Sequence, residues 1–307
     1  MSKVAYVFPG QGAQTVGMGK QLFDAFPEAR AVFEAADDAL SEKLTKLIFE
    51  GPEEALKLTA NTQPAILTVS VAAHAVFRKR GPAPDFVAGH SLGEYSALVA
   101  AGALALPDAV RSVRARGTFM QEAVPEGVGA MAAVIGLAPD KVKAVCDECA
   151  EGQVLQPANY NDPTQTVIAG HATAVERASA KLKEAGARRV LPLPVSAPFH
   201  CALMEPVKPR LREVLARLEV RAPSPPVVTN VEARPNADAA RVVPLLVDQV
   251  TASVRWVECV QALARLGVTR FVELGPGQAL SGMVKRIDRG LTCRNVEDSK
   301  SLEEALA

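Results

Sequence analysis

The stretch PDFVAGHSLGEYSALVAAGAL, residues 84–104, constrains the fold more than any other part of the sequence. It begins as a short apolar run typical of a buried strand and continues with the composition of a helix, and only the tight turn GHSLG separates the two. A second apolar run, KVAYVFP (3–9), shows no strict alternation and leads into the glycine-rich loop GQGAQTVGMG. Strands of this kind, buried on both faces and feeding helices, predict an α/β fold with a parallel sheet.

A different order of elements occupies the middle of the chain. Strand and helix patterns follow one another as β-α-β-β-α-β, in the segments GAMAAVIGL, PDKVKAVCDECA, QVLQPANYN, QTVIAG, ATAVERASAKLKEAG and RRVLPLPV. This order is typical of a ferredoxin-like unit. We therefore predict an α/β-hydrolase-like large subdomain formed by residues 1–126 and 196–307, and a ferredoxin-like small subdomain, residues 127–195, inserted in it.

Several further elements are predicted in the large subdomain. In QPAILTVSVAAHAVFRK, Thr62 is suited to cap a helix whose first turn contains Pro64. After the inserted unit, a helix (MEPVKPRLREVLARL) and a strand (PPVVTN) lead into a long helical region that contains Trp256. The strand TRFVELG and a closing helix complete the chain.

Composition excludes several classes of protein. The 34 basic and 34 acidic side chains cancel, so no global field attracts nucleic acid or an anionic membrane. There is neither a signal-peptide pattern nor an apolar stretch of about 20 residues, and we expect a cytoplasmic protein. Among the five cysteines, Cys146 and Cys149 form a Cys-x-x-Cys pair on a predicted amphipathic helix. Without a second pair or a nearby histidine, chance spacing is favoured over zinc binding or redox chemistry.

Ser91, at the centre of Gly-His-Ser-Leu-Gly, is a candidate nucleophile. The motif G-x-S-x-G needs a strand before it and a helix after it, and both are predicted here. The hydroxyl would then lie at a helix N-terminus, which favours developing negative charge, and the backbone N–H of Leu92 would contribute to an oxyanion hole. The alternative is a strand-to-helix turn in which Ser91 only caps the helix.

A serine nucleophile needs a general base, and the chain has four histidines. His74 lies in the middle of a predicted helix, and His171 follows a strand of the inserted unit. His90 adjoins Ser91, so its side chain should point away from the hydroxyl, which favours a supporting role. His200, in PVSAPFHCALM, is favoured as the base by elimination. No motif marks an acidic residue that would orient it, and a neutral side-chain carbonyl is an alternative.

Arg116 is a candidate for anion binding. Ala109, Val113, Arg116 and Met120 recur at helical spacing, which places the arginine on an apolar, inward stripe. A buried guanidinium needs an anionic partner. The residues alone leave open whether this partner is an internal carboxylate or a bound substrate.

Taken together, the motifs resemble the malonyl-CoA:acyl carrier protein transacylases from end to end. The matching segments are FPGQGAQ, TQPAILT, GHSLGEYSALVAAG, RGTFMQ, GAMAAVIGL, NYNDPTQTVIAG, SAPFHCALM and ELGPGQAL. The resemblance implies transfer of a malonyl group from coenzyme A to the phosphopantetheine thiol of acyl carrier protein, through a malonyl-serine intermediate, for fatty acid or polyketide synthesis. It also implies that no cofactor is used, and we expect a monomer.

The resemblance also implies roles for individual residues. Ser91 would be acylated, His200 would be its base, and the side-chain carbonyl of Gln249 would orient the histidine. Backbone N–H groups of Gln11 and Leu92 would form the oxyanion hole. The residues implied to contact or surround the malonyl group are Arg116, which would pair with its carboxylate, Phe199, which would crowd its α-carbon, and Gln63, His90 and Asn161.

Some alternatives remain at this stage. A serine thioesterase or hydrolase of the same fold would use the same dyad, and a discrete polyketide-type acyltransferase or a subunit that only docks carrier proteins are further possibilities. ELGPGQALSG resembles a dinucleotide-binding loop, but Leu280 stands where the third glycine belongs. The carrier protein is expected to be acidic, and Lys285 and Arg286 are either a basic docking rim or a solvated helix face.

Overall fold

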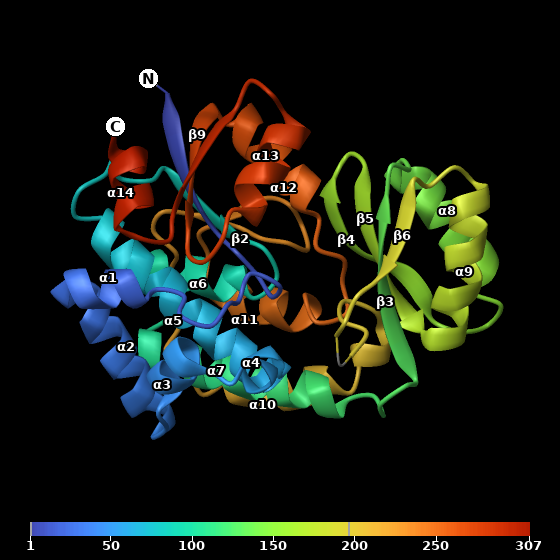
Figure 1. The fold of residues 1–307 in the computed structure, drawn as a ribbon, viewed down its shortest axis with the longest axis horizontal. Coiled ribbons are helices and arrows are strands. Elements are labelled where there is room, and N and C mark those ends of the chain that lie inside the picture. Colours follow the sequence, from blue (N-terminus) through green and yellow to red (C-terminus); the bar gives the residue numbers. More distant parts are fainter. Residues whose placement is uncertain (1, 196) are drawn as a thin grey trace.

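A computed structural model of the protein describes residues 2–195 and 197–307, which form two α/β units lying side by side (Figure 1). The large unit contains a six-stranded sheet and the small unit a four-stranded sheet. Both ends of the chain lie on the large unit, on the side away from the small sheet (Figure 1). The predicted fold class is confirmed. Among the described residues, no helix combines the length and the apolar character needed to cross a membrane.

The large sheet has the strand order β10-β9-β1-β2-β7-β8. Neighbouring strands are parallel except β7 and β8, so the carboxyl ends of β1, β2 and β7 meet at one edge. Strand β10 is missing from the sequence-based prediction, because only its last residue is buried at the edge of the sheet and its sequence TCRNV carries little apolar character. The strands are β1 (Lys3–Phe8), β2 (Phe86–Gly89), β7 (Val227–Val228), β8 (Pro235–Asn236), β9 (Val268–Leu274) and β10 (Thr292–Val296).

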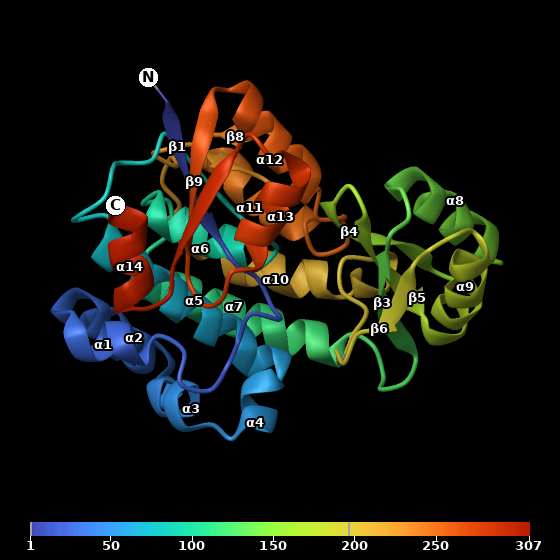
Figure 2. The same ribbon diagram turned by 45° about the horizontal axis from the view of Figure 1, so that its top comes forward.

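Helices cover both faces of this sheet (Figure 2). Tyr6 and Phe8 of β1 pack into a core with α2, α5 and α7, whereas Ala5 and Val7 pack into a second core with α12 and α13. This confirms the predicted burial of β1 on both faces. The helices of the large unit are α1 (Lys20–Ala25), α2 (Pro27–Leu40), α3 (Leu44–Glu50), α4 (Glu53–Lys57), α5 (Thr59–Phe77), α6 (Gly93–Ala100), α7 (Leu106–Glu122), α10 (Val207–Leu215), α11 (Ala239–Asp248), α12 (Trp256–Arg265), α13 (Ala279–Ile287) and α14 (Ser299–Leu306).

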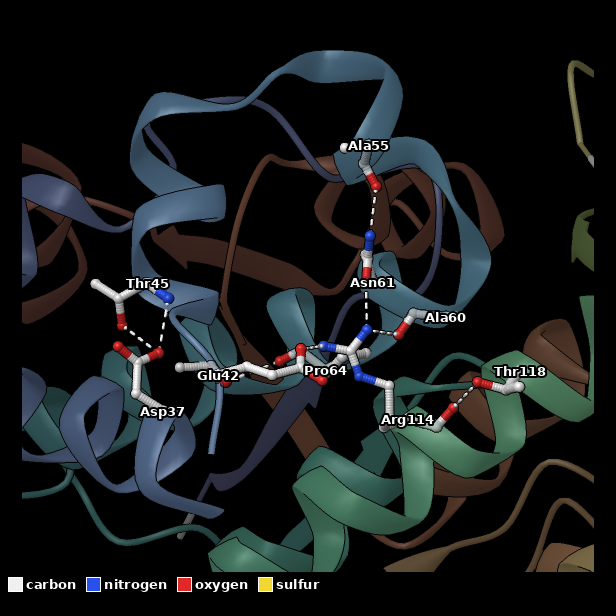
Figure 3. A network of polar contacts seen from close by, with 10 residues as sticks. Asp37, Glu42, Thr45, Ala55, Ala60, Asn61, Pro64, Arg114 and Thr118 are labelled. Atoms are coloured by element: carbon white, nitrogen blue, oxygen red, sulfur yellow. Dashed lines mark hydrogen bonds and ion pairs between the residues drawn. The ribbon is translucent and has the colours of Figure 1, made fainter. Parts of the chain in front are cut away.

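Helix α5 begins earlier than predicted and runs through Pro64. Proline has no N–H, so the carbonyl of Ala60, four residues before it, loses its helical partner. Arg114 of α7 donates from Nη1 to that carbonyl at 3.1 Å and also to the Asn61 side chain (Figure 3). The prediction of a cap at Thr62 is therefore wrong: a side chain from a neighbouring helix replaces the missing bond, and the helix starts a turn sooner.

The small unit has the strand order β4-β5-β3-β6, antiparallel throughout, which is the ferredoxin-like arrangement. One face of its sheet packs against α8 and α9, in a core that includes Cys146 and Cys149; the other face contributes Met131 to the core of the large unit. All five cysteines are free thiols. No cluster of metal-ligating side chains occurs in the described part of the chain. The elements are β3 (Gly129–Ile135), α8 (Pro139–Cys149), β4 (Leu155–Asp162), β5 (Gln165–His171), α9 (Ala172–Glu184) and β6 (Arg189–Pro192).

Strand β4 joins the two units. The backbone of Val254, in the large unit, forms two hydrogen bonds with the backbone of β4. Its carbonyl accepts from Tyr160 N at 2.9 Å, and its N–H donates to Ala158 O at 2.8 Å. Near the end of β4, the buried carboxylate of Asp162 accepts from Nε of Arg286 at 2.7 Å. Arg286 therefore forms an ion pair between the units while half of its side chain stays exposed, and its part in a basic docking rim stays a prediction. The exact boundaries at residues 127 and 195 remain predictions.

Candidate active site

Ser91 occupies a sharp turn between β2 and α6, with a backbone φ of 52°. The backbone crossing around it is very close. A Cβ on Gly89 would lie 1.9 Å from the carbonyl carbon of Gly93, and a Cβ on Gly93 would lie 2.1 Å from the carbonyl oxygen of Phe8. Side chains have no room there, so both glycines of the motif are required by the local packing. The Ser91 hydroxyl does not cap α6, and the capping alternative is therefore wrong.

Replacing Gly93 with alanine is expected to destabilise the protein by more than the ~1 to 3 kcal/mol typical of an overpacked core, because the new methyl group meets backbone atoms that cannot rotate away. Thermal unfolding would test this. Gly290→Ala is a matched control, since a Cβ there would meet only the Asp288 side chain at 3.2 Å. Wild-type stability in the Gly93 variant would contradict the packing argument.

His200 contacts the serine directly. Its Nε2 lies 2.7 Å from Ser91 Oγ, and its Nδ1 lies 2.9 Å from the main-chain carbonyl of Gln249 and 3.2 Å from that of Ala252. Carbonyl oxygens only accept hydrogen bonds, so Nδ1 carries the hydrogen in the neutral ring. Nε2 is then free to accept the serine proton, which is the tautomer a general base needs.

The predicted role of the Gln249 side chain is wrong. It is the main-chain carbonyl of Gln249 that orients His200. The predicted long helical region is interrupted between α11 and α12, and Gln249 is the C-cap residue of α11. The last carbonyls of a helix lack partners within the helix, and His200 satisfies one of them.

The electrostatic surroundings keep His200 neutral. Burial and, after it, the positive charge of Arg116 lower the pKa of His200 to about 3, against the opposing effect of the Gln249 carbonyl. An uncharged imidazole is the form able to take a proton from Ser91.

Arg116 lies beside the nucleophile and is almost fully buried. Its Nη1 donates to Gln63 Oε1 at 2.8 Å, and its Nη2 donates to Gln249 Oε1 at 3.1 Å and to Ser91 Oγ at 3.2 Å. All three acceptors are neutral oxygen atoms, and Nε has no partner among the described residues. No carboxylate in the described part of the chain forms an ion pair with this guanidinium. Of the two partners that the sequence left open for Arg116, an internal carboxylate makes no direct contact with it. The guanidinium is therefore available to a bound anion.

A cavity of about 100 Å³ opens beside these groups. Most of its polar lining comes from the large unit, mainly Gln11, Gln63, Ser91, Arg116 and His200, and the small unit adds Asn159 of β4. The rest of its wall is largely apolar, and the small unit supplies much of it: Met120 and Phe199 come from the large unit, and Met131, Leu193 and Val195 come from the segments 129–135 and 189–195. The cavity therefore lies where the two units meet.

Gln11, in the loop after β1, and Leu92, the N-cap residue of α6, line the cavity together with Ser91. The Gln11 side chain is used elsewhere, since its Nε2 donates to Thr59 Oγ1 at 3.2 Å. Neither backbone N–H donates to another described residue. Both groups therefore remain available as the donors of the predicted oxyanion hole.

His90 points away from the serine hydroxyl, as its position in the sequence suggested. Its Nε2 lies 2.8 Å from Asn161 Oδ1 on β4, and its ring lies 5.8 Å from that of Trp256. Burial lowers the pKa of His90. Asn161 contacts His90 but does not line the cavity, whereas Asn159 of the same strand does. The pair joins the large unit to the small one just behind the nucleophile.

Comparison with known proteins agrees with this site. The profile of the Acyl transferase domain matches residues 5–302. The malonyl CoA-acyl carrier protein transacylase of Bacillus subtilis is 49% identical over 307 residues, which cover 100% of this chain and 97% of that protein. The enzyme of the same name from Escherichia coli K12 is 50% identical over 309 residues, covering 100% and 99%. The chain belongs to the malonyl CoA-acyl carrier protein transacylase family.

Solved structures place this transacylase-family chain among close structural relatives. An acyl carrier protein S-malonyltransferase from Vibrio cholerae superimposes with a TM-score of 0.96 at 45% identity, over 99% of each chain. A malonyl-transacylase in complex with a type II PKS acyl-carrier protein gives a TM-score of 0.97 at 47% identity, over 99% of each chain.

Two polar residues of this transacylase site are missing from the sequence-based prediction. Asn230, at the end of the PPVVTN segment, accepts from Ser91 N and donates to Gly89 O, both at 2.7 Å, and so braces the turn. Glu94 is a buried carboxylate in the otherwise apolar helix α6. Burial raises its pKa to about 7, against the lowering effect of hydrogen bonds from Asn230 and Gln249 and of the Arg116 charge. A lone acid among apolar helix residues was the available signal.

The glycine-rich loop before α13 is closed by the protein itself. Glu273, at the end of β9, accepts from Leu280 N at 3.0 Å and from Ser281 N at 2.7 Å. These are the helix N-terminal amides that a dinucleotide phosphate would use. The loop therefore favours a structural role over nucleotide binding.

Proposed function

We propose that the chain transfers a malonyl group from coenzyme A to the phosphopantetheine thiol of acyl carrier protein through a malonyl ester of Ser91. The observation that carries this proposal is the buried guanidinium of Arg116, 3.2 Å from the nucleophile and bonded only to neutral oxygens. In a malonyl ester the free carboxylate lies two bonds beyond the ester carbonyl carbon. A charge at that position reaches a guanidinium beside the serine, where arginine offers two parallel N–H donors.

The first half of the reaction loads the enzyme. His200 Nε2 takes the proton of Ser91 Oγ as the oxygen attacks the thioester carbonyl. The resulting oxyanion accepts hydrogen bonds from the backbone N–H groups of Gln11 and Leu92. The carbon–sulfur bond then breaks, coenzyme A leaves as its thiol with the proton held by His200, and the malonyl ester of Ser91 remains.

The second half reverses these steps with a different thiol. The phosphopantetheine thiol gives its proton to His200 and attacks the ester carbonyl, and the same two amides stabilise the oxyanion. The Ser91–carbon bond breaks, and His200 returns the proton to Oγ. Arg116 holds the carboxylate in both halves, so the malonyl group keeps its place while the thiols exchange.

We propose that this reaction takes place in the cytoplasm, that the enzyme acts as a monomer, and that it serves fatty acid or polyketide synthesis. Five free thiols favour a reducing compartment. No cofactor is part of the proposal, because the serine, the histidine and the guanidinium supply every proton transfer and charge that the two steps need.

The alternative function is a hydrolase that gives the acyl group to water. The dyad of Ser91 and His200 serves either reaction, so the dyad does not distinguish them. A guanidinium reserved for the acyl carboxylate, together with family membership, favours transfer.

Intact-protein mass spectrometry tests the proposal. Wild-type enzyme mixed with malonyl-CoA should gain one malonyl group, and holo carrier protein should remove it and gain the same mass. Ser91→Ala should gain nothing. Release of free malonate without loading of the carrier would support the hydrolase, and absence of any adduct and turnover would overturn the proposed function.

Phe199, immediately before His200, lies in the cavity wall and is buried. We expect Phe199→Ala to raise the kcat/KM for methylmalonyl-CoA relative to malonyl-CoA by about 10- to 100-fold, because an apolar pocket discriminates one methyl group by ~1 to 3 kcal/mol. Competition between the two thioesters, read by mass on the carrier protein, measures this ratio. Met204→Ala, a buried residue outside the cavity, is the control. An unchanged ratio would mean that Phe199 does not crowd the α-carbon.

A further inference from the structure

Glu94 lies beneath the catalytic groups, in the first turn of α6 and shielded from solvent. One of its oxygens, Oε2, accepts two hydrogen bonds, from Gln249 Nε2 at 2.9 Å and from Asn230 N at 2.9 Å. The same Gln249 Nε2 also donates to the main-chain carbonyl of Ser91 at 3.1 Å. The carboxylate therefore contacts two residues that contact the nucleophile but does not contact the substrate cavity.

These contacts fix the orientation of the Gln249 amide. An amide has a donor end and an acceptor end, and the carboxylate of Glu94 and the carbonyl of Ser91 both require the donor. The acceptor, Oε1, is thereby turned toward Arg116 Nη2 at 3.1 Å. A flipped amide would place its oxygen against two acceptors and its NH₂ against a guanidinium, which only donates.

The indirect arrangement also leaves the guanidinium usable. A carboxylate in direct contact with Arg116 would occupy the N–H groups that an incoming acyl carboxylate needs. The negative charge of Glu94 still stabilises the positive charge of Arg116 from beyond the Gln249 amide, and of the two side chains only Gln249 contacts the guanidinium, through one neutral oxygen. The guanidinium of Arg116 is thus stabilised by a nearby negative charge without forming an ion pair with it.

We propose that Glu94 is a positioning residue that gives the site its preference for acyl groups bearing a carboxylate, by fixing the Gln249 amide that holds Arg116. This inference rests on the proposed malonyl transfer and goes beyond it, because it assigns the selectivity to a residue that touches neither substrate nor nucleophile side chain. Glu94 also accepts from Asn230 N, and loading of an acyl group without a carboxylate reports any effect through that second contact. The orientation of His200 depends on a main-chain carbonyl and should not change.

The test compares malonyl-CoA with acetyl-CoA, which lacks the carboxylate that Arg116 would bind. For Glu94→Ala we expect the ratio of kcat/KM for malonyl to that for acetyl loading of Ser91 to fall by about tenfold or more, as for loss of a hydrogen bond to a charged group. The fall should appear mainly in KM for malonyl-CoA, with acetyl loading within about threefold of wild type. Glu94→Gln, whose amide oxygen can still accept both N–H groups, should restore most of the ratio.

A shorter acid guards against a variant that does not fold. Glu94→Asp keeps the charge but withdraws the carboxylate by about 1.5 Å, one carbon–carbon bond, and should give an intermediate loss of the ratio. In a Gln249→Ala background, Glu94→Asp should have no further effect on the ratio, because the amide through which it acts is gone. Equal losses for malonyl and acetyl groups, or an unchanged ratio in Glu94→Asp and Glu94→Ala, would overturn the inference while leaving the proposed function intact. Failure of the wild-type enzyme to form a malonyl adduct would overturn both.

Discussion

Replacing His200 with alanine is expected to lower kcat/KM for malonyl loading by roughly 10³- to 10⁵-fold, the range for loss of a general base that acts as a unit with its nucleophile. Among the cavity-lining residues, His200 is the titratable group hydrogen-bonded to Ser91 Oγ, at 2.7 Å, with its nitrogen free to accept a proton. Both acylation of Ser91 and its discharge by carrier protein should slow, because the same nitrogen serves both halves. The rate of appearance of the malonyl adduct by mass spectrometry measures the first, and its decay measures the second.

His171→Ala is the matched control for this variant. His171 lies on the small unit, where its Nδ1 accepts from Val154 N at 3.0 Å, and it does not line the cavity. We expect it to keep loading within about twofold of wild type, as surface substitutions usually do. A His200 variant that retained a tenth of wild-type activity would mean that another group takes the serine proton.

The acid side of the pH profile provides a second measurement on His200. Its active form is neutral, so kcat/KM for acetyl-CoA, whose loading does not use the guanidinium that Glu94 supports, should fall only when the pH drops through the pKa of His200 in the free enzyme. Because burial and the Arg116 charge lower that pKa to about 3, acetyl loading should stay level from pH 8 to about pH 5, whereas an ordinary histidine would be half protonated near pH 6.5. An acid limb centred at 6.5 would contradict this assignment.

The second large effect is expected from Arg116→Ala, which should lower kcat/KM for malonyl-CoA by roughly 10²- to 10³-fold while leaving acetyl-CoA little changed. Removing one partner of a buried charge pair costs about 3 to 5 kcal/mol, and acetyl groups form no such pair. Arg116→Lys should fall between, because an ammonium keeps the charge but lacks the planar fork. Kinetics with both thioesters would measure the change in preference.

Arg111→Ala is the control on the same helix. Arg111 is exposed and pairs with Asp108, so its loss should affect neither thioester. If Arg116→Ala lowered malonyl and acetyl loading equally, the guanidinium would serve the catalytic groups in general and the malonyl proposal would lose its support.

The positions of site residues that were predicted correctly from the sequence depend on local geometry. The place of Ser91 and Leu92 between a strand and a helix follows from a turn with two glycines, all within one short stretch. The inward position of Arg116 follows from spacing along a single helix. Each of these features is decided by residues close together in the chain, so their pattern alone contains the information.

The parts that were missed depend on contacts between distant segments. The start of α5 is set by Arg114, which lies 54 residues beyond Ala60. Glu94 and Asn230 are 136 residues apart. Neither segment has a pattern that predicts the position of the Gln249 side-chain amide between Glu94 and Arg116. Side-chain and main-chain oxygens of the same residue also cannot be told apart by sequence, which is why the Gln249 carbonyl that orients His200 was assigned to the wrong atom.

Because His200 is oriented by the main-chain oxygen of Gln249, its orientation does not depend on the side chain at position 249. A main-chain oxygen is present whichever amino acid occupies position 249, so substitutions there leave the support of His200 in place. They alter only the side-chain contacts of Gln249 with Arg116, with Glu94 and with the Ser91 carbonyl. The two tasks of the site, activating the serine and choosing the acyl group, thus meet at one residue but are separable by mutation. Variants at 249 that keep full turnover of uncharged acyl groups while losing malonate are the natural starting material for a transferase with a different cargo.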